Sequence, residues 1–457
     1  MQEGTKLPTG IILLLSCLAT LSCTRGRMVS RPLTEEEMQI PPGRTESGCD
    51  IQHTSQVDLR SPAVEPVFEW KYVGSKFGNL LVDGENGAWF SCKGSGSSSR
   101  NSITRLNADG SFDWVHEFYP ASPDIDVPSD SGWMSYANPA VASYGAVICS
   151  FERTRILDFS SLDEMPDESE PSDLILDRYL ACIDIDGVMR WRSERLDAPL
   201  VSVSRIDGSR IVTFHSDTSV VLYSISSGEL MDVIEFGTNL GTLAFPPVVP
   251  VEDDWICFTD ETEGYFVSRY DENLAEVWKT YLGGGLSIRA VQADDTSILV
   301  NSGFGLKSIG LSDGSLRWDR EYETAGLCAA THAGGYLVLN GGGFGQERRL
   351  SGLSQDGSEL WSMNIPMISA GLDDVLVYND GSILVGYKWG ISLLNSDGSI
   401  RWTIDYDDMG LSGLPSYREG FWIWELCPLE DGGLIAKGEN YIIPDIQTTI
   451  FKFSPPS

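Results

Sequence analysis

The chain of 457 residues carries 66 acidic and 32 basic residues, which gives a formal net charge of -34 at pH 7. A field of this sign repels nucleic acid and anionic lipid headgroups, so no nucleic-acid partner is expected. It attracts basic protein surfaces or divalent cations, although the solubility of an exported protein is the simpler explanation of the charge.

The N-terminus is typical of an export signal. Lys6 precedes an apolar stretch, Ile11–Leu21, which is too short to cross a bilayer core of about 30 Å as a helix. We therefore predict a cleaved, lipoprotein-type signal peptide over residues 1–22. Small residues before Cys23 resemble a bacterial lipoprotein signal, in which the cysteine thiol receives a diacylglycerol. Cys23 is the predicted lipidation site, Cys17 is an alternative with a shorter apolar core, and plain secretion is the outcome without acylation.

The segment that follows has no sustained periodicity. Residues 23–64 are rich in Arg, Glu, Pro, Ser and Gly, which predicts a flexible tether. A coil of about 40 residues spans roughly 35 Å, enough to hold a domain clear of the lipid headgroups. Thr24 stands where an Asp would retain a lipoprotein at the inner membrane, which favours the outer membrane, on its periplasmic or its cell-surface face.

The rest of the chain repeats one sequence motif, which consists of a short apolar strand, an Asp-Gly turn and a strand that carries Trp. The repeat tryptophans, predicted to be structural, are Trp70, Trp114, Trp191, Trp278, Trp318, Trp361 and Trp402. A further copy ends at Asp232, where the Trp is lost. From residue 70 the copies follow at steps of 44, 77, 41, 46, 40, 43 and 41 residues. The one large step contains a predicted acidic loop insertion near 158–176, with six carboxylates within Ser161–Asp173.

Within each repeat the apolar residues alternate with period two. Ser297–Leu311 reads as a strand, a Gly turn and a second strand before the Asp-Gly hairpin. Four short antiparallel strands at this spacing are typical of propeller blades, and a solenoid of two-stranded repeats is the structural alternative. We predict an all-β chain with a single eight-bladed β-propeller over residues 65–457. The isolated strand Val67–Tyr72 is expected to complete the last blade and close the ring.

The repeat Leu299–Trp318 resembles that of pyrroloquinoline-quinone-type (quinoprotein-like) β-propellers, and the resemblance covers about residues 66–457. That family includes quinone-dependent alcohol dehydrogenases and non-enzymatic propellers. One of the latter is the lipoprotein subunit of the outer-membrane β-barrel assembly machinery. The enzymes need adjacent cysteines, a carboxylate base and Ca²⁺ ligands beside a stacking Trp, and this sequence has no adjacent cysteines. We therefore expect no quinone cofactor, no catalytic residue and no enzyme activity.

No residue set has the spacing of a metal site, so no metal is predicted. The histidines fall in different repeats or in the tether, and we expect unrelated surface or strand residues at His53, His116, His215 and His332. The chain has no C-x-x-C, which argues against zinc ribbons and thioredoxin chemistry. Three cysteines within apolar strands are expected to be buried, unbridged thiols: Cys92, Cys149 and Cys257.

Four other stretches permit a binding site as well as a simpler explanation. Asp184–Asp186 and Glu252–Asp254 offer carboxylates for Ca²⁺, which needs six to eight oxygens, and turn formation explains both. Asn340–Gly345 is rich in Gly, but no helix follows it to present N–H groups to a phosphate, so a hairpin is expected. Trp422 and Trp424 alternate onto one strand face, either to line a carbohydrate or peptide groove or, as we favour, to pack between blades.

These observations favour a binding protein. We expect a monomeric, lipid-anchored scaffold of the cell envelope that presents blade loops or a strand edge to an envelope protein. The alternative is a polysaccharide- or small-molecule-binding propeller, or a propeller enzyme, with an acidic funnel.

Overall fold

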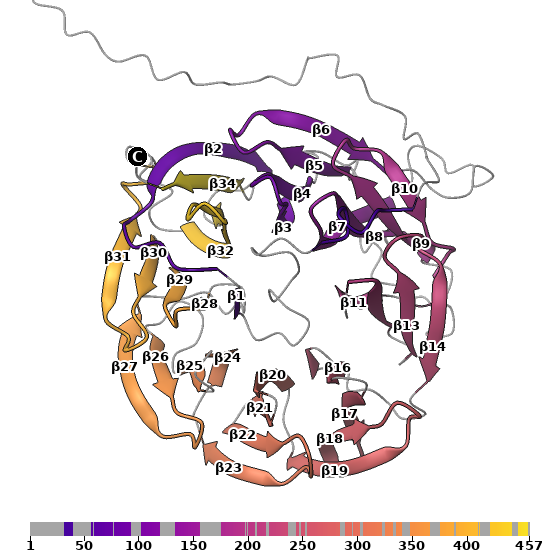
Figure 1. The fold of residues 1–457 in the computed structure, drawn as a ribbon, viewed down its shortest axis with the longest axis vertical. Helices are drawn as coiled ribbons and strands as arrows, with labels where there is room; N and C mark the ends of the chain where they lie inside the picture. Colours follow the sequence, from indigo (N-terminus) through magenta and orange to yellow (C-terminus); the bar gives the residue numbers. More distant parts are fainter. Residues whose placement is uncertain are drawn as a thin grey trace, which may run out of the picture.

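The chain folds into a ring of eight antiparallel β-sheets (Figure 1). All 34 regular elements in the described part of the chain are strands, so the predicted all-β, eight-bladed propeller is confirmed. The computed structural model describes residues 32–39, 56–57, 59–75, 77–92, 102–118, 133–155, 175–196, 198, 200–205, 208–215, 219–235, 244–245, 248–251, 254–283, 288–294, 296–301, 305–321, 325–331, 335–340, 348–365, 375–387, 390–409, 411, 421–440 and 447–455.

The first four blades follow one another along the chain, and in each the strand order runs from the inner to the outer edge. Blade 1 contains β3 (Phe77–Val82), β4 (Ala88–Cys92), β5 (Ser102–Leu106) and β6 (Phe112–Glu117). Blade 2 contains β7 (Trp133–Ala142), β8 (Ala146–Arg155), β9 (Ile175–Asp184) and β10 (Met189–Arg192). Blade 3 contains β11 (Leu200–Arg205), β12 (Arg210–His215), β13 (Ser219–Ser224) and β14 (Leu230–Glu235). Blade 4 contains β16 (Val248–Val251), β17 (Asp254–Glu261), β18 (Gly264–Tyr270) and β19 (Glu276–Gly283).

Two of the remaining blades gain a short fifth strand at the inner edge. Blade 5 contains β20 (Ile288–Asp294), β21 (Ser297–Asn301), β22 (Gly305–Gly310) and β23 (Leu316–Glu321), with β15 (Ala244–Phe245) added parallel to β20. Blade 6 contains β24 (Ala325–Ala330), β25 (Tyr336–Asn340), β26 (Arg348–Leu353) and β27 (Glu359–Ile365). Blade 7 contains β28 (Val375–Tyr378), β29 (Ile383–Tyr387), β30 (Gly390–Leu394) and β31 (Ile400–Asp405), with β1 (Gln56–Val57) added parallel to β28.

Blade 8 joins the two ends of the chain. It contains β32 (Phe421–Pro428), β33 (Leu434–Asn440), β34 (Gln447–Ser454) and, as the outer strand, β2 (Val67–Ser75). β2 runs antiparallel to β34, with Lys71 opposite Phe451 and Tyr72 opposite Ile450. This pairing confirms the predicted closure by the N-terminal strand, and the eight blades form a closed ring (Figure 1).

The repeat tryptophans fasten seven of the eight blades to the next part of the ring. In every outer strand the register shifts immediately before the Trp position, and such a bulge re-aims the side chain that follows it. The indole N–H then donates to a backbone carbonyl of the following blade, as from Trp361 Nε1 to the Ser396 oxygen at 2.9 Å. The corresponding acceptors are the carbonyls of Ala108, Ile185, Ile225, Leu311, Gln355 and Pro62, for Trp70, Trp114, Trp191, Trp278, Trp318 and Trp402.

The turn glycine of the following blade lies directly under the indole ring. A Cβ on Gly398, which has φ of 81°, would lie 2.5 Å from the ring of Trp361. Gly357 has the same relation to Trp318, with φ of 78° and a closest ring atom at 2.9 Å. The glycine of the Asp-Gly pair is therefore needed both for its positive φ and for its lack of a side chain.

The junction between blades 3 and 4 departs from this pattern. Blade 3 has Asp232 at the Trp position, and the following turn has Leu274, with φ of 61°, at the Gly position. The Leu274 side chain packs against a cluster of buried residues from blades 3 and 4, which includes Phe214, Ile234 and Trp255. A leucine therefore stands at the turn position that Gly357 and Gly398 hold below Trp318 and Trp361.

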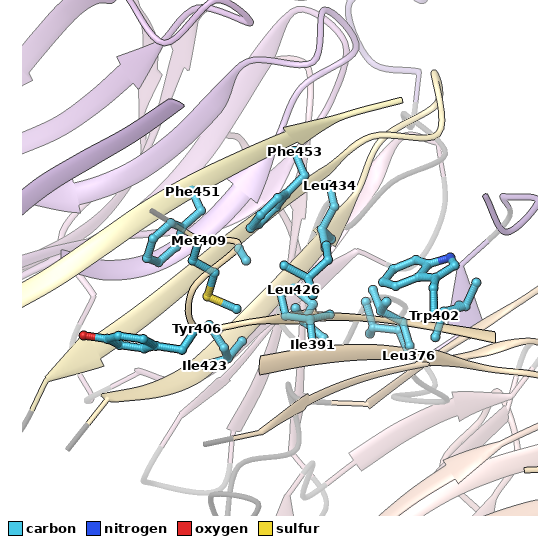
Figure 2. Packing of buried hydrophobic residues seen from close by; sticks show 14 of the residues in the cluster. Leu376, Ile391, Trp402, Tyr406, Met409, Ile423, Leu426, Leu434, Phe451 and Phe453 are labelled. Atoms are coloured by element: carbon cyan, nitrogen blue, oxygen red, sulfur yellow. The ribbon is translucent and has the colours of Figure 1, made fainter. Parts of the chain in front are cut away.

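The core consists of apolar layers between adjacent blades. Figure 2 shows the layer between blades 7 and 8, where Leu376 and Ile391 face Ile423 and Leu426. Phe421 packs edge to face against Phe451, with ring centroids 5.7 Å apart. Each blade buries its faces only against its neighbours, so the ring has a series of cores around its circumference.

The prediction of a flexible tether over 23–64 is wrong for its described segments. Leu33 is buried among residues of blades 2 and 3, and its N–H donates to the Ser226 oxygen at 3.2 Å. Thr34 and Glu37 form a reciprocal capping turn, with the Thr34 N–H donating to Glu37 Oε2 at 2.7 Å. Leu59 is buried between blades 7 and 8. Single apolar residues in a polar stretch hold this segment on the ring, and they produce no periodicity that a sequence would show.

Candidate functional site

The rim of the ring, formed by the outer strands, carries its exposed large apolar side chains. Most outer strands expose one or two of them, such as Leu360 on β27 and Ile400 on β31. Among the outer strands as described, β14 exposes three, with exposed fractions of 58% for Leu230, 53% for Met231 and 47% for Val233. The edge of blade 3 is therefore the most apolar part of the rim.

The carboxylates of the Asp-Gly turns are used locally. Asp313 Oδ1 accepts the Ser315 N–H at 3.0 Å, and Asp397 Oδ1 accepts the Ser399 N–H at 2.9 Å. The hydrogen bonds from Ser315 and Ser399 lower the pKa of each carboxyl, so both are ionised at neutral pH. These groups stabilise turns and are not arranged around a common centre.

The buried guanidinium of Arg105 forms ion pairs with three carboxylates in blade 1. The Arg105 guanidinium contacts Asp83 at 2.8 Å, Glu85 at 2.8 Å and Asp113 at 2.6 Å. Burial alone would lower the pKa of Arg105, but Asp83 and the hydrogen bonds to all three carboxylates raise it. The cluster links the inner hairpin to the outer strand, and all its charges are paired within the blade, so we interpret it as structural.

A second buried ion pair lies at the closure. Lys437 Nζ contacts Glu425 Oε1, and both side chains are almost fully buried in blade 8. Glu425 Oε2 accepts the Leu80 N–H of blade 1 at 2.6 Å. This carboxylate therefore ties the last blade to the first.

The described histidines and cysteines are buried, and of these only Cys149 and Cys182, on the adjacent strands β8 and β9, share a blade. His116 Nδ1 lies 3.1 Å from the Gly187 oxygen, and His215 Nε2 lies 2.8 Å from Thr213 Oγ1. Both are strand residues, as predicted, but neither is on the surface. Cys149 and Cys257 are buried free thiols, as predicted, and burial raises the pKa of both.

Two of the candidate Ca²⁺ carboxylates, Asp184 and Asp254, have other partners, and Glu252 and Asp253 lie outside the described residues. Asp184 accepts the Asp186 and Val188 N–H groups and pairs with Arg190, so it forms a turn as predicted. Asp254 pairs with Arg269 at 2.6 Å, an interaction that turn chemistry did not predict. Within the described residues no group of three or more His, Cys, Asp or Glu side chains is placed to hold a metal ion.

The aromatic pair of blade 8 does not form an exposed groove from Trp422, whose side chain is only 5% exposed. The register of β32 shifts between Ile423 and Glu425, which interrupts the alternation on which the groove interpretation depended. The orientation of Trp424 lies outside the described residues.

Several predicted features fall outside the described residues. They are Cys17, Cys23, His53, His332, the loop 341–345, most of the acidic insertion 158–176, which lies between β8 and β9, and the side chain of Cys92. Within the described part of the chain, no helix has the length and apolarity to cross a membrane.

Sequence reasoning missed the apolar edge of blade 3. The signal was present, because Leu230-Met-Asp-Val-Ile234 is an apolar run without a basic residue at the one copy that lacks Trp. We treated that copy only as a weak repeat.

The ring aligns with solved propeller structures at low sequence identity. BamB from Moraxella catarrhalis aligns with a TM-score of 0.50 and 12% identity, over 84% of this chain and 100% of that chain. The quinohemoprotein alcohol dehydrogenase from Comamonas testosteroni aligns with a TM-score of 0.54 and 10% identity, over 90% and 80% of the two chains. A europium-containing methanol dehydrogenase aligns with a TM-score of 0.53 and 8% identity, over 92% and 99%.

The fold is a β-propeller like that of these solved structures. At these identities the likeness shows the fold alone, and the fold is shared by BamB and by dehydrogenases. No protein-family model matches the chain, and no curated protein sequence matches it.

Proposed function

We propose that this protein is a non-catalytic scaffold of the bacterial cell envelope, anchored by a lipid on Cys23, that presents its propeller to a protein partner. The observation that carries the proposal is a closed ring whose rim exposes apolar strand edges. A rigid ring of this kind displays its edges and loops in fixed positions, which suits it to binding proteins. The alignment with BamB over the whole of that chain supports the propeller fold on which this proposal depends.

The packed N-terminal segment changes how the anchor would act. The chain is fastened to blades 2 and 3 from Leu33 onward. Only about ten residues then separate a lipid on Cys23 from the ring, and an extended chain of that length reaches at most about 35 Å. The propeller would be held close to the bilayer on the side of blades 2 and 3.

Fractionation of the native envelope tests the anchor. We expect the wild-type protein in the membrane fraction, with a diacylglycerol on Cys23 detected by mass spectrometry of the N-terminal peptide. Cys23→Ser should release the protein from the membrane, whereas the matched control Cys17→Ser should leave it bound. An unmodified Cys23, or a Cys23→Ser variant that stays in the membrane, would contradict the lipid anchor.

The scaffold role is tested separately, by crosslinking the intact protein in native membranes and identifying what co-purifies. We expect one envelope protein to be recovered at near-equal molar amount. Recovery of the propeller alone after efficient crosslinking would contradict the role.

A further inference from the structure

The outer strand of blade 3, β14, combines several features of an open docking edge. It lies on the circumference of the ring, with no described strand beyond it (Figure 1). After the bulge at Met231 it pairs regularly with β13, with Asp232 opposite Leu222 and Val233 opposite Val221. The other edge of this segment is therefore an extended backbone that can accept a further strand.

An outward-facing backbone N–H of β14 donates to a side chain, and a partner strand can replace that side chain as the acceptor. The Val233 N–H donates to Asp232 Oδ1 at 2.8 Å, and both residues are exposed. A carbonyl of an added strand can take over that N–H, which leaves the Asp232 carboxylate available for a basic side chain.

Within the described residues, the carboxylates beside this edge form no ion pair. On β6 and β27, the other outer strands without Lys or Arg, the carboxylates pair with an arginine of the neighbouring strand, Asp113 with Arg105 and Glu359 with Arg349. Within the described part of blade 3, neither Glu229 nor Asp232 has an ion pair, and both are exposed. The five remaining outer strands carry Lys or Arg, which discourages edge-to-edge pairing.

We propose that β14 is the docking strand of this scaffold, and that it binds an extended segment of a partner protein in which Lys or Arg alternates with apolar residues. The segment adds to blade 3 as a fifth, outer strand. Its apolar side chains cover Leu230, Met231 and Val233, and its basic side chains meet Glu229 and Asp232. A second copy of this chain is disfavoured as the occupant because each carries a net charge of -34.

This proposal rests on the proposed function for its partner, but its test does not depend on the envelope. The purified full chain is used to select from a displayed library of random 12-residue peptides, and one enriched peptide is then synthesised with a fluorescent label. We expect enriched peptides to alternate basic and apolar residues. Binding measured by anisotropy should weaken at least about tenfold between 50 and 500 mM salt, because the ion pairs at an exposed edge are screened.

Two variants of β14 are compared with matched variants of β27. Val233→Pro removes the outward N–H and Met231→Asp adds a like charge, while Ser362→Pro and Leu360→Asp make the same changes at the equivalent positions of blade 6. The β14 variants should weaken binding of the labelled peptide at least about tenfold, which is about 1.4 kcal/mol. The β27 variants should change it less than about twofold. If Val233→Pro lowers the melting temperature, Met231→Asp, at an exposed side chain, decides the test.

Three results would overturn the proposal. They are the absence of any enriched peptide, enriched peptides that bind the β14 variants as tightly as wild type, and a dimer in sedimentation experiments that Met231→Asp dissociates. The last result would assign the edge to a second copy of the chain. If a partner is still crosslinked in native membranes in any of these cases, the scaffold role stands and only the docking strand is wrong.

Discussion

At the residue scale, the glycine of an Asp-Gly turn has to adopt a positive φ and also to leave room for an indole ring. Gly398 takes φ of 81° and lies against the ring of Trp361, whereas Gly432, with φ of 85°, has nothing within 4 Å of its Cβ position. The two glycines have nearly the same φ, and an indole ring lies at the Cβ position of Gly398 alone. Substitutions at the two positions therefore distinguish the cost of a Cβ at positive φ from the cost of losing the indole contact between blades.

We predict that Gly432→Ala lowers the free energy of unfolding by about 1 kcal/mol, the cost of a Cβ at positive φ. Gly398→Ala should cost about 1–3 kcal/mol more, because the Cβ displaces the Trp361 ring and overpacks the junction. Denaturant unfolding of both variants checks this. Equal losses in the two variants would show that the indole contact contributes nothing.

His116 makes the stability depend on pH. Burial lowers the pKa of this histidine, against the smaller effects of the Gly187 carbonyl and Asp184, which raise it. As the pH falls below 6.5, the ordinary value, the unfolded chain takes up a proton that the native chain does not. The contribution of His116 is thus fully present above this pH and is lost as the pH falls toward its native pKa.

We predict that the free energy of unfolding falls between pH 7.5 and pH 5.5, and that His116→Gln makes this decrease smaller. The difference in slope is at most about 1.4 kcal/mol per pH unit, the limit for one proton. Urea unfolding at a series of pH values measures it. Identical slopes in the two proteins would contradict the assignment.

At the element scale, the junction of blades 3 and 4 differs from the other junctions in which element supplies the packing side chain. Seven junctions use a Trp from the preceding blade, and this one uses Leu274 from the following turn. The exchange leaves Asp232 free to face solvent on the edge that we propose binds the partner. Loss of the Trp and the apolar edge are therefore two results of one local change.

A double-mutant cycle tests this exchange. Leu274→Gly should destabilise the protein because it removes apolar packing against the buried cluster at this junction, and Asp232→Trp should destabilise it because the indole meets Leu274. Together they recreate the arrangement of the other junctions. We predict a favourable coupling of about 0.5–3 kcal/mol in the melting of the double variant. Additive losses would show that the two positions do not share a space.

The regular elements were predictable because their signal is repeated, and the irregular ones were not. Period-two alternation and the Asp-Gly-Trp motif recur in phase, so they predicted the blades and the closing strand. β1 and β15 are two residues each and pair in parallel with distant strands, which leaves no local pattern. The groove that we gave as the disfavoured alternative at Trp422 does not form, because the side chain is buried and a bulge, which strand alternation does not reveal, follows it in β32.

At the scale of the whole molecule, the ring is held at both ends of the chain. β2 completes blade 8, and Glu425 joins blade 8 to blade 1 through the Leu80 N–H. Upstream, the Trp402 N–H contacts the Pro62 oxygen, and the Ser61 hydroxyl donates to Asp380 at 2.5 Å. Because the ring is closed, each blade is held by both of its neighbours and the outer strands stay in fixed positions. The proposed docking at β14 requires such fixed positions.

Hydrogen exchange of the amides of Val67–Ser75 in the full-length protein tests the closure most directly. If β2 is the outer strand of blade 8, we predict that its amides bonded to β34 exchange at least about a hundredfold more slowly than an unstructured chain, and at rates close to those of β33. Exchange of these amides at the unstructured rate, while β33 stays protected, would contradict the closed ring.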